Sequence, residues 1–272
     1  MATFRQRMPA MSVSDPKSGM FSKEYLQPDN QLQDHIHAYI VLQADFPDPV
    51  NRDYMLLPQV HPFLLLNLSE THTIQNKQTG EYLLRHLLIP PHHQSLSFRI
   101  SPRMKILAIQ GVAGSGSHLF EDILQLDHIQ QQLSQCKDTQ SMRTLLNTLL
   151  SACLKCEKRS AGSIREAVRV ILHTGGNVLI RQLEAATFQT KRTLERGFLT
   201  QTGLHLKMFC RIIRFRRAIA CIEKEKQLCW AKLAQDCGYC DQTHFINEFH
   251  FFAGCLPGAY IGTPSSFEQA IG

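Results

Sequence analysis

Two groups of polar side chains in the C-terminal half have the types and the spacing that binding to a nucleic acid requires. The groups are Lys191, Arg192, Thr193 and Arg196, and then Gln242, Thr243 and Asn247. Arginine can pair with a guanine edge through two hydrogen bonds, and asparagine or glutamine can pair with an adenine edge. A lysine at the start of a helix more often contacts a phosphate. These residues are therefore candidates for reading a groove of DNA.

The second group lies in a stretch, Ala234 to Tyr260, whose turn residues and aromatics are typical of a helix-turn-helix. Gly238 and Tyr239 supply a turn, and Asp241 is placed to cap the helix that follows. That helix has one aromatic face and ends before a glycine and a proline: Phe245, Phe249, Phe252, Gly254 and Pro257. An ordinary helical hairpin has the same aromatic spacing, so this pattern alone leaves both interpretations open.

The first group lies in a second copy of the pattern, which begins at Leu183. Small residues and a polar turn lead into a helix with Phe198 on its inner face. Phe198 precedes Gly203 by the same distance in sequence as Phe249 precedes Gly254. Because chance would have to produce the pattern twice, the repetition favours two helix-turn-helix units.

One long helix is predicted between the two copies, from Lys207 to Ile222. Its apolar residues recur every three or four positions, at Met208, Ile212, Phe215, Ile219 and Ile222. This spacing indicates an amphipathic rod that holds the two units apart.

Residues from about Ser163 to Tyr260 resemble the C-terminal domain of the AraC/XylS family of bacterial transcription regulators, in which a long helix joins two helix-turn-helix units. In the second unit the matching residues are Ala234, Gly238, Tyr239, Asp241, Gln242, His244, Phe245, Phe249, Gly254, Pro257 and Tyr260. In the first unit and the connecting helix they are Leu183, Leu194, Arg196, Phe198, Gly203, Arg214 and Ala218. Three positions depart from the pattern: Glu184, usually small; Gly197, inside a helix; and Leu206, usually proline. A mid-helix glycine costs roughly 1 kcal/mol.

The resemblance implies a regulator that binds double-stranded promoter DNA and recruits RNA polymerase as an activator. It also implies a leading domain that senses a small-molecule effector or forms a homodimer. We expect no enzyme activity and no cofactor.

Helical geometry separates the inner and outer faces of the two recognition helices. At about 100° per residue, Arg192 and Arg196 point away from the inward side chains, with Thr193 and Thr200 beside them. On the second helix the outward residues are Thr243, Asn247 and His250. No Lys or Arg occurs from Asp241 to Phe252. Because phosphate neutralisation supplies much of DNA affinity, the first unit is expected to dominate binding.

The distribution of charge agrees with this assignment. The segment from Gly162 onward has 14 Lys plus Arg against 9 Asp plus Glu, whereas the rest of the chain has 15 against 14. The basic excess therefore lies with the proposed DNA reader. No apolar run approaches the ~18 residues that span a bilayer, and no apolar block follows Arg5 and Arg7 as in a secretory signal. We expect a cytoplasmic protein with a loosely ordered leader over residues 1–20.

The remaining segments predict an α+β protein. From 21 to 118, short apolar runs between Pro, Asn and Gly indicate a β-rich sensor or regulatory domain, either a sheet or a cupin-like barrel. From 119 to 161, helical periodicity indicates a dimerisation or linker region. Its apolar positions are Ile123, Leu126, Ile129, Leu133, Met142, Leu145, Leu146, Leu149 and Leu150. The DNA-binding domain of two helix-turn-helix units occupies 162–272.

Histidines crowd the β-rich half: His35, His37, His61, His72, His86, His92, His93, His118 and His128. A barrel can gather imidazoles around a metal ion. However, paired histidines followed by a nearby glutamate are missing, and adjacent His92 and His93 would point to opposite faces of a strand. We therefore expect scattered histidines and no metal site.

The run GVAGSGSH from Gly111 is close to a phosphate-binding loop, but Ser117 stands where that loop needs lysine. A flexible loop after a strand is the simpler expectation.

The nine cysteines all lie at or after Cys136 and include Cys153-x-x-Cys156 and Cys237-x-x-Cys240. Two such pairs suit zinc, but Cys237 is expected to face the core, and an odd count favours reduced thiols. A redox switch at an exposed Cys240 remains an alternative.

Two other classes of protein compete with a DNA-binding regulator. A cytoplasmic enzyme or metal-binding cupin-like protein with an appended helical domain would need a convergent cluster of catalytic residues, and none has suitable spacing. A protein-only adaptor would explain the charge-poor second helix, but Arg192 and Arg196 argue against it.

Overall fold

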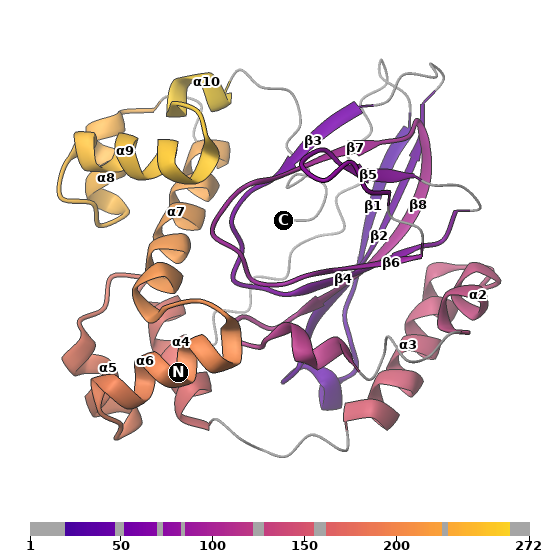
Figure 1. Ribbon diagram of the computed structural model, residues 1–272, viewed down its shortest axis with the longest axis horizontal. Coiled ribbons are helices and arrows are strands. Elements are labelled where there is room, and N and C mark those ends of the chain that lie inside the picture. The colour runs from indigo at the N-terminus through magenta and orange to yellow at the C-terminus, as the bar shows by residue number, and fades with distance from the viewer. Residues whose placement is uncertain are drawn as a thin grey trace.

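The computed structural model of this chain describes residues 20–46, 52–69, 73–82, 85–121, 128–154, 162–224 and 228–261. Most of the predicted leader lies outside these ranges, as do Ile123, Leu126, His72 and Cys156. In Figure 1 a β-rich part lies beside a helical part, which confirms the predicted α+β class.

The β-rich part consists of two antiparallel sheets that face each other. One has the strand order β1-β2-β8-β4-β6 and the other β3-β7-β5. The strands are β1 (Met20–Leu26), β2 (Ile36–Asp45), β3 (Arg52–Leu56), β4 (Phe63–Asn67), β5 (Ile74–Asn76), β6 (His86–Ile89), β7 (Leu96–Ile100) and β8 (Arg103–Gly111). A short 3-10 helix, η1 (Asn30–Leu32), precedes β2.

Both faces of the larger sheet are buried, because side chains alternate between the faces along each strand. On β2, Ile40 and Leu42 point into the core between the two sheets, whereas Tyr39 and Val41 point to the opposite side. The sequences of the central strands are therefore nearly continuous apolar runs.

Helices cover the outer face of this sheet. They are η2 (Ser117–Phe120), α2 (Ile129–Ser134) and α3 (Thr139–Leu154). Of the described apolar positions predicted in this region, five are buried and two, Leu145 and Leu149, are partly buried; the buried ones are Ile129, Leu133, Met142, Leu146 and Leu150. The buried Tyr39 donates its hydroxyl hydrogen to Asn147 Oδ1 at 2.8 Å, so the polar group that this packing buries is satisfied.

The C-terminal part contains α4 (Gly162–His173), α5 (Ile180–Thr187), α6 (Lys191–Thr202), α7 (Leu206–Lys224), α8 (Trp230–Asp236), α9 (Gln242–Ala253) and α10 (Pro257–Ile261). In Figure 1, α7 runs from α4, α5 and α6 at one end to α8, α9 and α10 at the other. The predicted rod is therefore a single helix between two helical groups.

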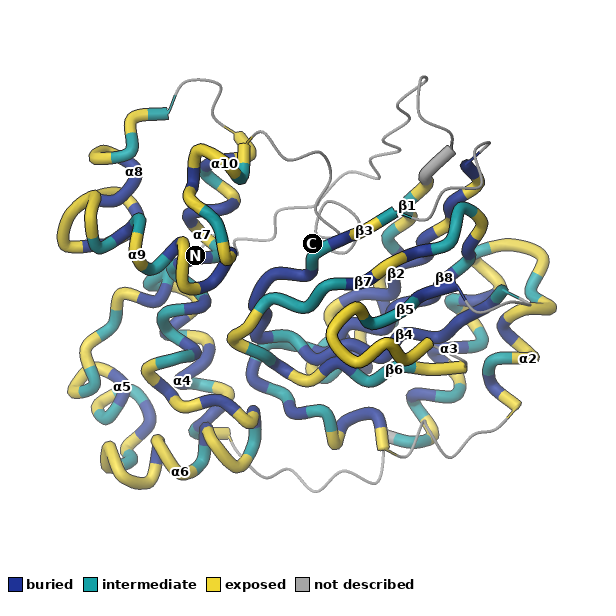
Figure 2. The backbone as a smooth tube through the Cα atoms, turned by 45° about the horizontal axis from the view of Figure 1, so that its top comes forward, coloured by how far each residue is buried: buried dark blue, intermediate teal, exposed yellow. Residues whose placement is uncertain are grey.

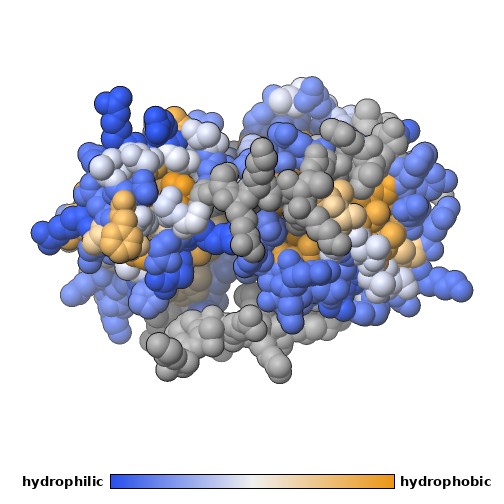
Figure 3. All heavy atoms as spheres, turned by 90° about the horizontal axis from the view of Figure 1, so that it is seen from below, coloured by the Kyte–Doolittle hydropathy of each residue, from blue (hydrophilic) through white to orange (hydrophobic). Residues whose placement is uncertain are grey.

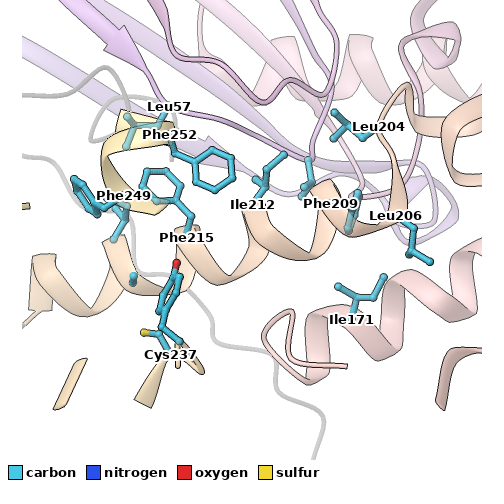
Figure 4. Close-up of a cluster of buried hydrophobic side chains, with 14 of the residues drawn as sticks. Leu57, Ile171, Leu204, Leu206, Phe209, Ile212, Phe215, Cys237, Phe249 and Phe252 are labelled. Carbon is cyan, nitrogen blue, oxygen red and sulfur yellow. The ribbon is translucent and has the colours of Figure 1, made fainter. Parts of the chain in front are cut away.

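The apolar face of α7 organises the core of this part. Figure 4 shows Phe209, Ile212 and Phe215 projecting from α7 into one cluster. The ring centroid of Phe215 lies 5.4 Å from that of Phe249 and 5.0 Å from that of Phe252. Each buried aromatic contributes on the order of 1.5–3 kcal/mol through removal of apolar surface from water. The same cluster includes Leu57 and Val60, so the β-rich part packs against the helices.

The outer sides of the helical part are exposed, whereas most of the central strands are buried (Figure 2). Within the described ranges, no helix combines the length and the apolar character needed to cross a bilayer.

Candidate nucleic-acid interface

The second unit has the geometry of a helix-turn-helix. After α8, Gly238 adopts a φ of 81°, which lets the chain turn sharply. A Cβ there would lie 2.1 Å from Asn177 Nδ2, which itself donates to the Cys237 carbonyl at 3.0 Å. Asp241 then caps α9, because its carboxylate accepts the backbone N–H of His244 at 2.7 Å. The predicted turn and cap are both present.

The first unit repeats this geometry with different residues. Thr190 caps α6 by accepting the backbone N–H of Thr193 at 3.3 Å. The Glu184 carboxylate accepts the backbone N–H of Lys191 at 2.7 Å, which satisfies another free donor at the start of α6. The unusual glutamate therefore stabilises the recognition helix.

The mid-helix glycine also has a packing role. A Cβ on Gly197 would lie 2.7 Å from Ile164 Cδ1 in α4. The glycine lets the two helices approach closely, which offsets part of its cost to helix stability.

All of the candidate DNA-contacting side chains are exposed: Lys191, Arg192, Thr193, Arg196, Gln242, Thr243 and Asn247. Leu194 and Phe198 in α6, and Phe245 and Phe249 in α9, are fully buried on the opposite sides of their helices. The structure thus places Arg192 and Arg196 together on one outer face, and Thr243 and Asn247 on the corresponding face of α9.

Two side chains in this group also have local partners. The Thr193 hydroxyl lies 3.0 Å from the Thr190 hydroxyl, so Thr193 takes part in the helix cap. Lys191 Nζ lies 3.8 Å from Glu195 Oε1, and because this ion pair is exposed it contributes little to the stability of the fold.

Sequence reasoning missed one exposed residue on the same face of α6 as Arg192 and Arg196. Leu199 is 44% exposed and lies one turn after Arg196, on the arginine side of α6. The helical angles that place the arginines on this face also place Leu199 there. The left half of Figure 3, which shows the helical part of the chain, has a mostly hydrophilic surface with small hydrophobic areas.

Comparison with known families identifies the kind of domain that has this geometry. Residues 183–262, which span both units, match a family model described as a helix-turn-helix domain, of the AraC type. The C-terminal part of the chain therefore contains a helix-turn-helix domain of the AraC type. No curated protein sequence matches the chain.

Among solved structures, the chain is similar to ToxT from Vibrio cholerae, with 10% identity and a TM-score of 0.45 over 78% of this chain and 97% of ToxT. A xylose-binding transcription activator, XylR, shares 18% identity at a TM-score of 0.34, covering 44% of this chain and 39% of XylR. The AraC-like transcriptional activator CuxR shares 13% identity at a TM-score of 0.28, covering 74% of this chain and 81% of CuxR.

The β-rich part of this chain contacts the C-terminal ends of α6 and α9. Gln201, near the end of α6, donates from Nε2 to the Gly114 carbonyl at 3.0 Å. Ser95, just before β7, donates from Oγ to the Phe252 carbonyl at 2.6 Å near the end of α9. The β-rich part thus contacts both helix-turn-helix units.

The glycine-rich run after β8 forms one of these contacts. Gly114 has a φ of 86°, and a Cβ on it would lie 2.5 Å from Val168 Cγ2 in α4. A Cβ on Gly116 would lie 2.2 Å from the Gln201 carbonyl oxygen. The expectation of a simple flexible loop is therefore wrong, because these glycines allow close packing between the β-rich part and the helical part.

The cysteines and histidines lie partly as the sequence predicts. Cys237 is buried as predicted, burial raises the pKa of its thiol to about 12, and Cys240 is exposed. Within the described ranges, no three His, Cys, Asp or Glu side chains gather in a way that would hold a metal ion. The absence of a metal site in the whole protein stays a prediction.

Proposed function

We propose that this regulator reads promoter DNA with α6 and α9 in successive major grooves, about 34 Å apart on one face of the duplex. The observation that carries this proposal is the duplicated cap geometry, which presents Arg192 with Arg196 and Thr243 with Asn247 outward. α7 is the rod that sets the separation between the two helices.

The two units have unequal roles in this proposal. Lys191 contacts a phosphate, and Arg192 and Arg196 pair with guanine edges or phosphates. Gln242 and Asn247 pair with adenine edges, and Thr243 contacts the same groove. Because α9 lacks cations over Asp241 to Phe252, the first unit supplies most of the charge-dependent affinity.

The regulatory part of the proposal concerns the other domain. Residues 21–118 form the sensor domain, 119–161 a dimerisation or linker region, and 162–272 the DNA-binding domain. Gln59 Nε2 is a buried donor without a partner among the described residues, between Leu57 and Val60 at the domain contact. A small polar effector would supply a partner there, and its binding would act on the contacts of Gly114 and Ser95 with the recognition helices. Activation then proceeds through recruitment of RNA polymerase.

The first test is binding of the full chain to a pool of random duplexes across a salt series, followed by sequencing of the retained DNA. The proposal predicts a motif with two half-elements about one helical turn apart. The double variant Arg192→Ala/Arg196→Ala is expected to lose the motif while keeping its fold, since both side chains are exposed. Retention that depends on salt but enriches no motif would contradict sequence-specific reading.

A second test separates reading from regulation. The fragment 162–272 and the full chain are compared for affinity to the selected duplex, each with its folded content checked by circular dichroism. Equal affinity and equal salt dependence would contradict control of DNA reading by the N-terminal domain.

A further inference from the structure

Phe188 combines two unfavourable features in the turn between α5 and α6. Its side chain is 92% exposed, more than any other large hydrophobic side chain in the described ranges. Its backbone has φ 54° and ψ 32°, in the left-handed region, and no other residue except glycine has a positive φ among those described. Neither feature helps the isolated protein to fold.

The second unit shows what the fold alone would favour. There the left-handed residue of the turn is Gly238, which has no side chain to crowd the following carbonyl. The aromatic next to it, Tyr239, is 5% exposed and its ring lies 5.4 Å from that of Phe245. In the first unit the aromatic itself takes the left-handed position and points outward. Strain of this kind is characteristic of functional positions.

We propose that Phe188 is a DNA-contacting residue, whose ring packs against deoxyribose and a thymine methyl at the edge of the groove that α6 enters. This inference rests on the proposed function, because it requires α6 to lie in a major groove. It adds an apolar, charge-independent contact to the arginines already described.

The neighbourhood of Phe188 favours DNA as its partner. The chain passes from Phe188 through the capping residue Thr190 directly into the exposed Lys191 and Arg192, and the first turn of α6 contains no acidic residue. The positive end of the helix dipole adds to these cations, so this edge attracts the phosphate backbone. The Glu184 carboxylate, in α5, accepts the Lys191 backbone N–H at 2.7 Å.

The sugar face between phosphates and the thymine methyl group are the apolar surfaces available at that edge. Along a DNA strand, charged phosphates alternate with apolar sugar faces. The ring of Phe188 beside Lys191 and Arg192 fits this alternation. Leu199, 44% exposed further along α6, provides a second apolar contact on the same helix.

The test uses the full chain and the duplex selected from the random pool. Phe188→Gly removes the ring and relieves the backbone, and Tyr82→Ala, which removes an exposed aromatic from the β-rich part, is the matched control. We expect Phe188→Gly to weaken DNA binding by at least about tenfold and to leave the slope of log K against log salt unchanged, because no charge is lost. Arg192→Ala should instead reduce that slope by about one.

A second measurement asks what the ring touches. Thymines flanking the first half-element are replaced one at a time by uracil, which lacks only the methyl group. At one position this replacement should weaken binding of the parent and leave Phe188→Gly unaffected. Affinity of Phe188→Gly within twofold of the parent would overturn the proposal.

Two further outcomes separate this inference from others. Normal DNA affinity together with lost capture of RNA polymerase would assign the ring to a protein partner and overturn DNA contact. A parent protein that enriches no motif would contradict the proposed function itself, whatever Phe188→Gly does. Thermal unfolding of Phe188→Gly at or above the parent's midpoint shows that lost affinity does not come from a damaged fold.

Discussion

The guanidinium of Arg211 in α7 forms a bidentate ion pair with the carboxylate of Glu248 in α9. Nη2 lies 2.7 Å from Oε1 and Nε lies 3.0 Å from Oε2, and the two side chains are 22% and 12% exposed. The guanidinium carbon also lies 4.7 Å from the centroid of the Phe251 ring. This pair fixes the second recognition helix on the rod, and therefore its direction relative to α6.

Removing the carboxylate should loosen that attachment. Glu248→Ala leaves Arg211 without its partner in a mostly buried setting, which should lower the free energy of unfolding by roughly 1.5–3 kcal/mol. Urea unfolding measures this loss. Glu166→Ala, which removes an exposed pair with Arg169 within α4, is the matched control and should change stability by only about 0.5 kcal/mol. Equal losses in the two variants would show that the Arg211 pair has no special structural role.

The two recognition helices should respond differently to loss of an outward side chain. Arg196→Ala should weaken DNA binding more than Asn247→Ala and should reduce the salt slope by about one, because only the arginine neutralises charge. Asn247→Ala should leave that slope unchanged. Titration of a fluorescent duplex at several salt concentrations gives both quantities. If Arg196→Ala weakens binding no more than Asn247→Ala, the unequal division between the units is wrong.

The close packing at Gly114 predicts a cost for any side chain there. Gly114→Ala should lower the free energy of unfolding by more than about 1 kcal/mol, because alanine is disfavoured at positive φ and its Cβ would meet Val168. Gly80→Ala is a matched control, since Gly80 has a φ of 75° but a Cβ there would have no atom within 4 Å. The difference between the two variants isolates the contact between the domains. Equal shifts of the denaturant midpoint in Gly114→Ala and Gly80→Ala would contradict a tight contact at Gly114.

Because His61 is held in its neutral form, we expect the folded protein to lose stability in mild acid. Burial, and then the neighbouring His37, lower the pKa of His61 to about 3, and Arg216 also acts against its protonation. The unfolded chain binds a proton near the ordinary pKa of about 6.5, so stability is fully present above that pH and is lost as the pH falls toward about 3. His61→Asn can still donate to the Gly111 carbonyl, which lies 2.9 Å from His61 Nδ1. Between about pH 7 and about pH 5, its unfolding midpoint should shift less than that of the parent.

Thiol labelling tests the cysteine assignment. Cys229 and Cys240 are exposed and should react with an alkylating reagent in the native protein. Cys237 should react only after unfolding, because burial raises the pKa of its thiol to about 12. Mass spectrometry locates the labels, and a DNA titration of the labelled protein tests the redox alternative. Unchanged affinity after labelling of Cys240 would contradict a redox switch at that position.

Much of the helical part was accessible from the sequence because its signals are local. A cap such as Asp241 acts on a backbone N–H three residues away, and Phe245 with Phe249 defines a face through helical spacing. The exposed positions of Arg192 and Arg196 follow from the same spacing. The strands were less defined, since β2 pairs with β8 across a long stretch of chain, and continuous apolar runs do not reveal which strands are neighbours.

The sequence by itself determined the two helix-turn-helix units, the rod between them and the outward faces of their recognition helices, because these depend on residues within one or two turns. Only the tertiary structure decided what Arg211 pairs with, why Gly197 and Gly114 are glycines, and that Phe188 points outward in a left-handed turn. Those features depend on atoms that are distant in sequence, or on a backbone conformation that neighbouring surfaces impose. Spacing along one chain cannot specify such contacts until the elements have packed together.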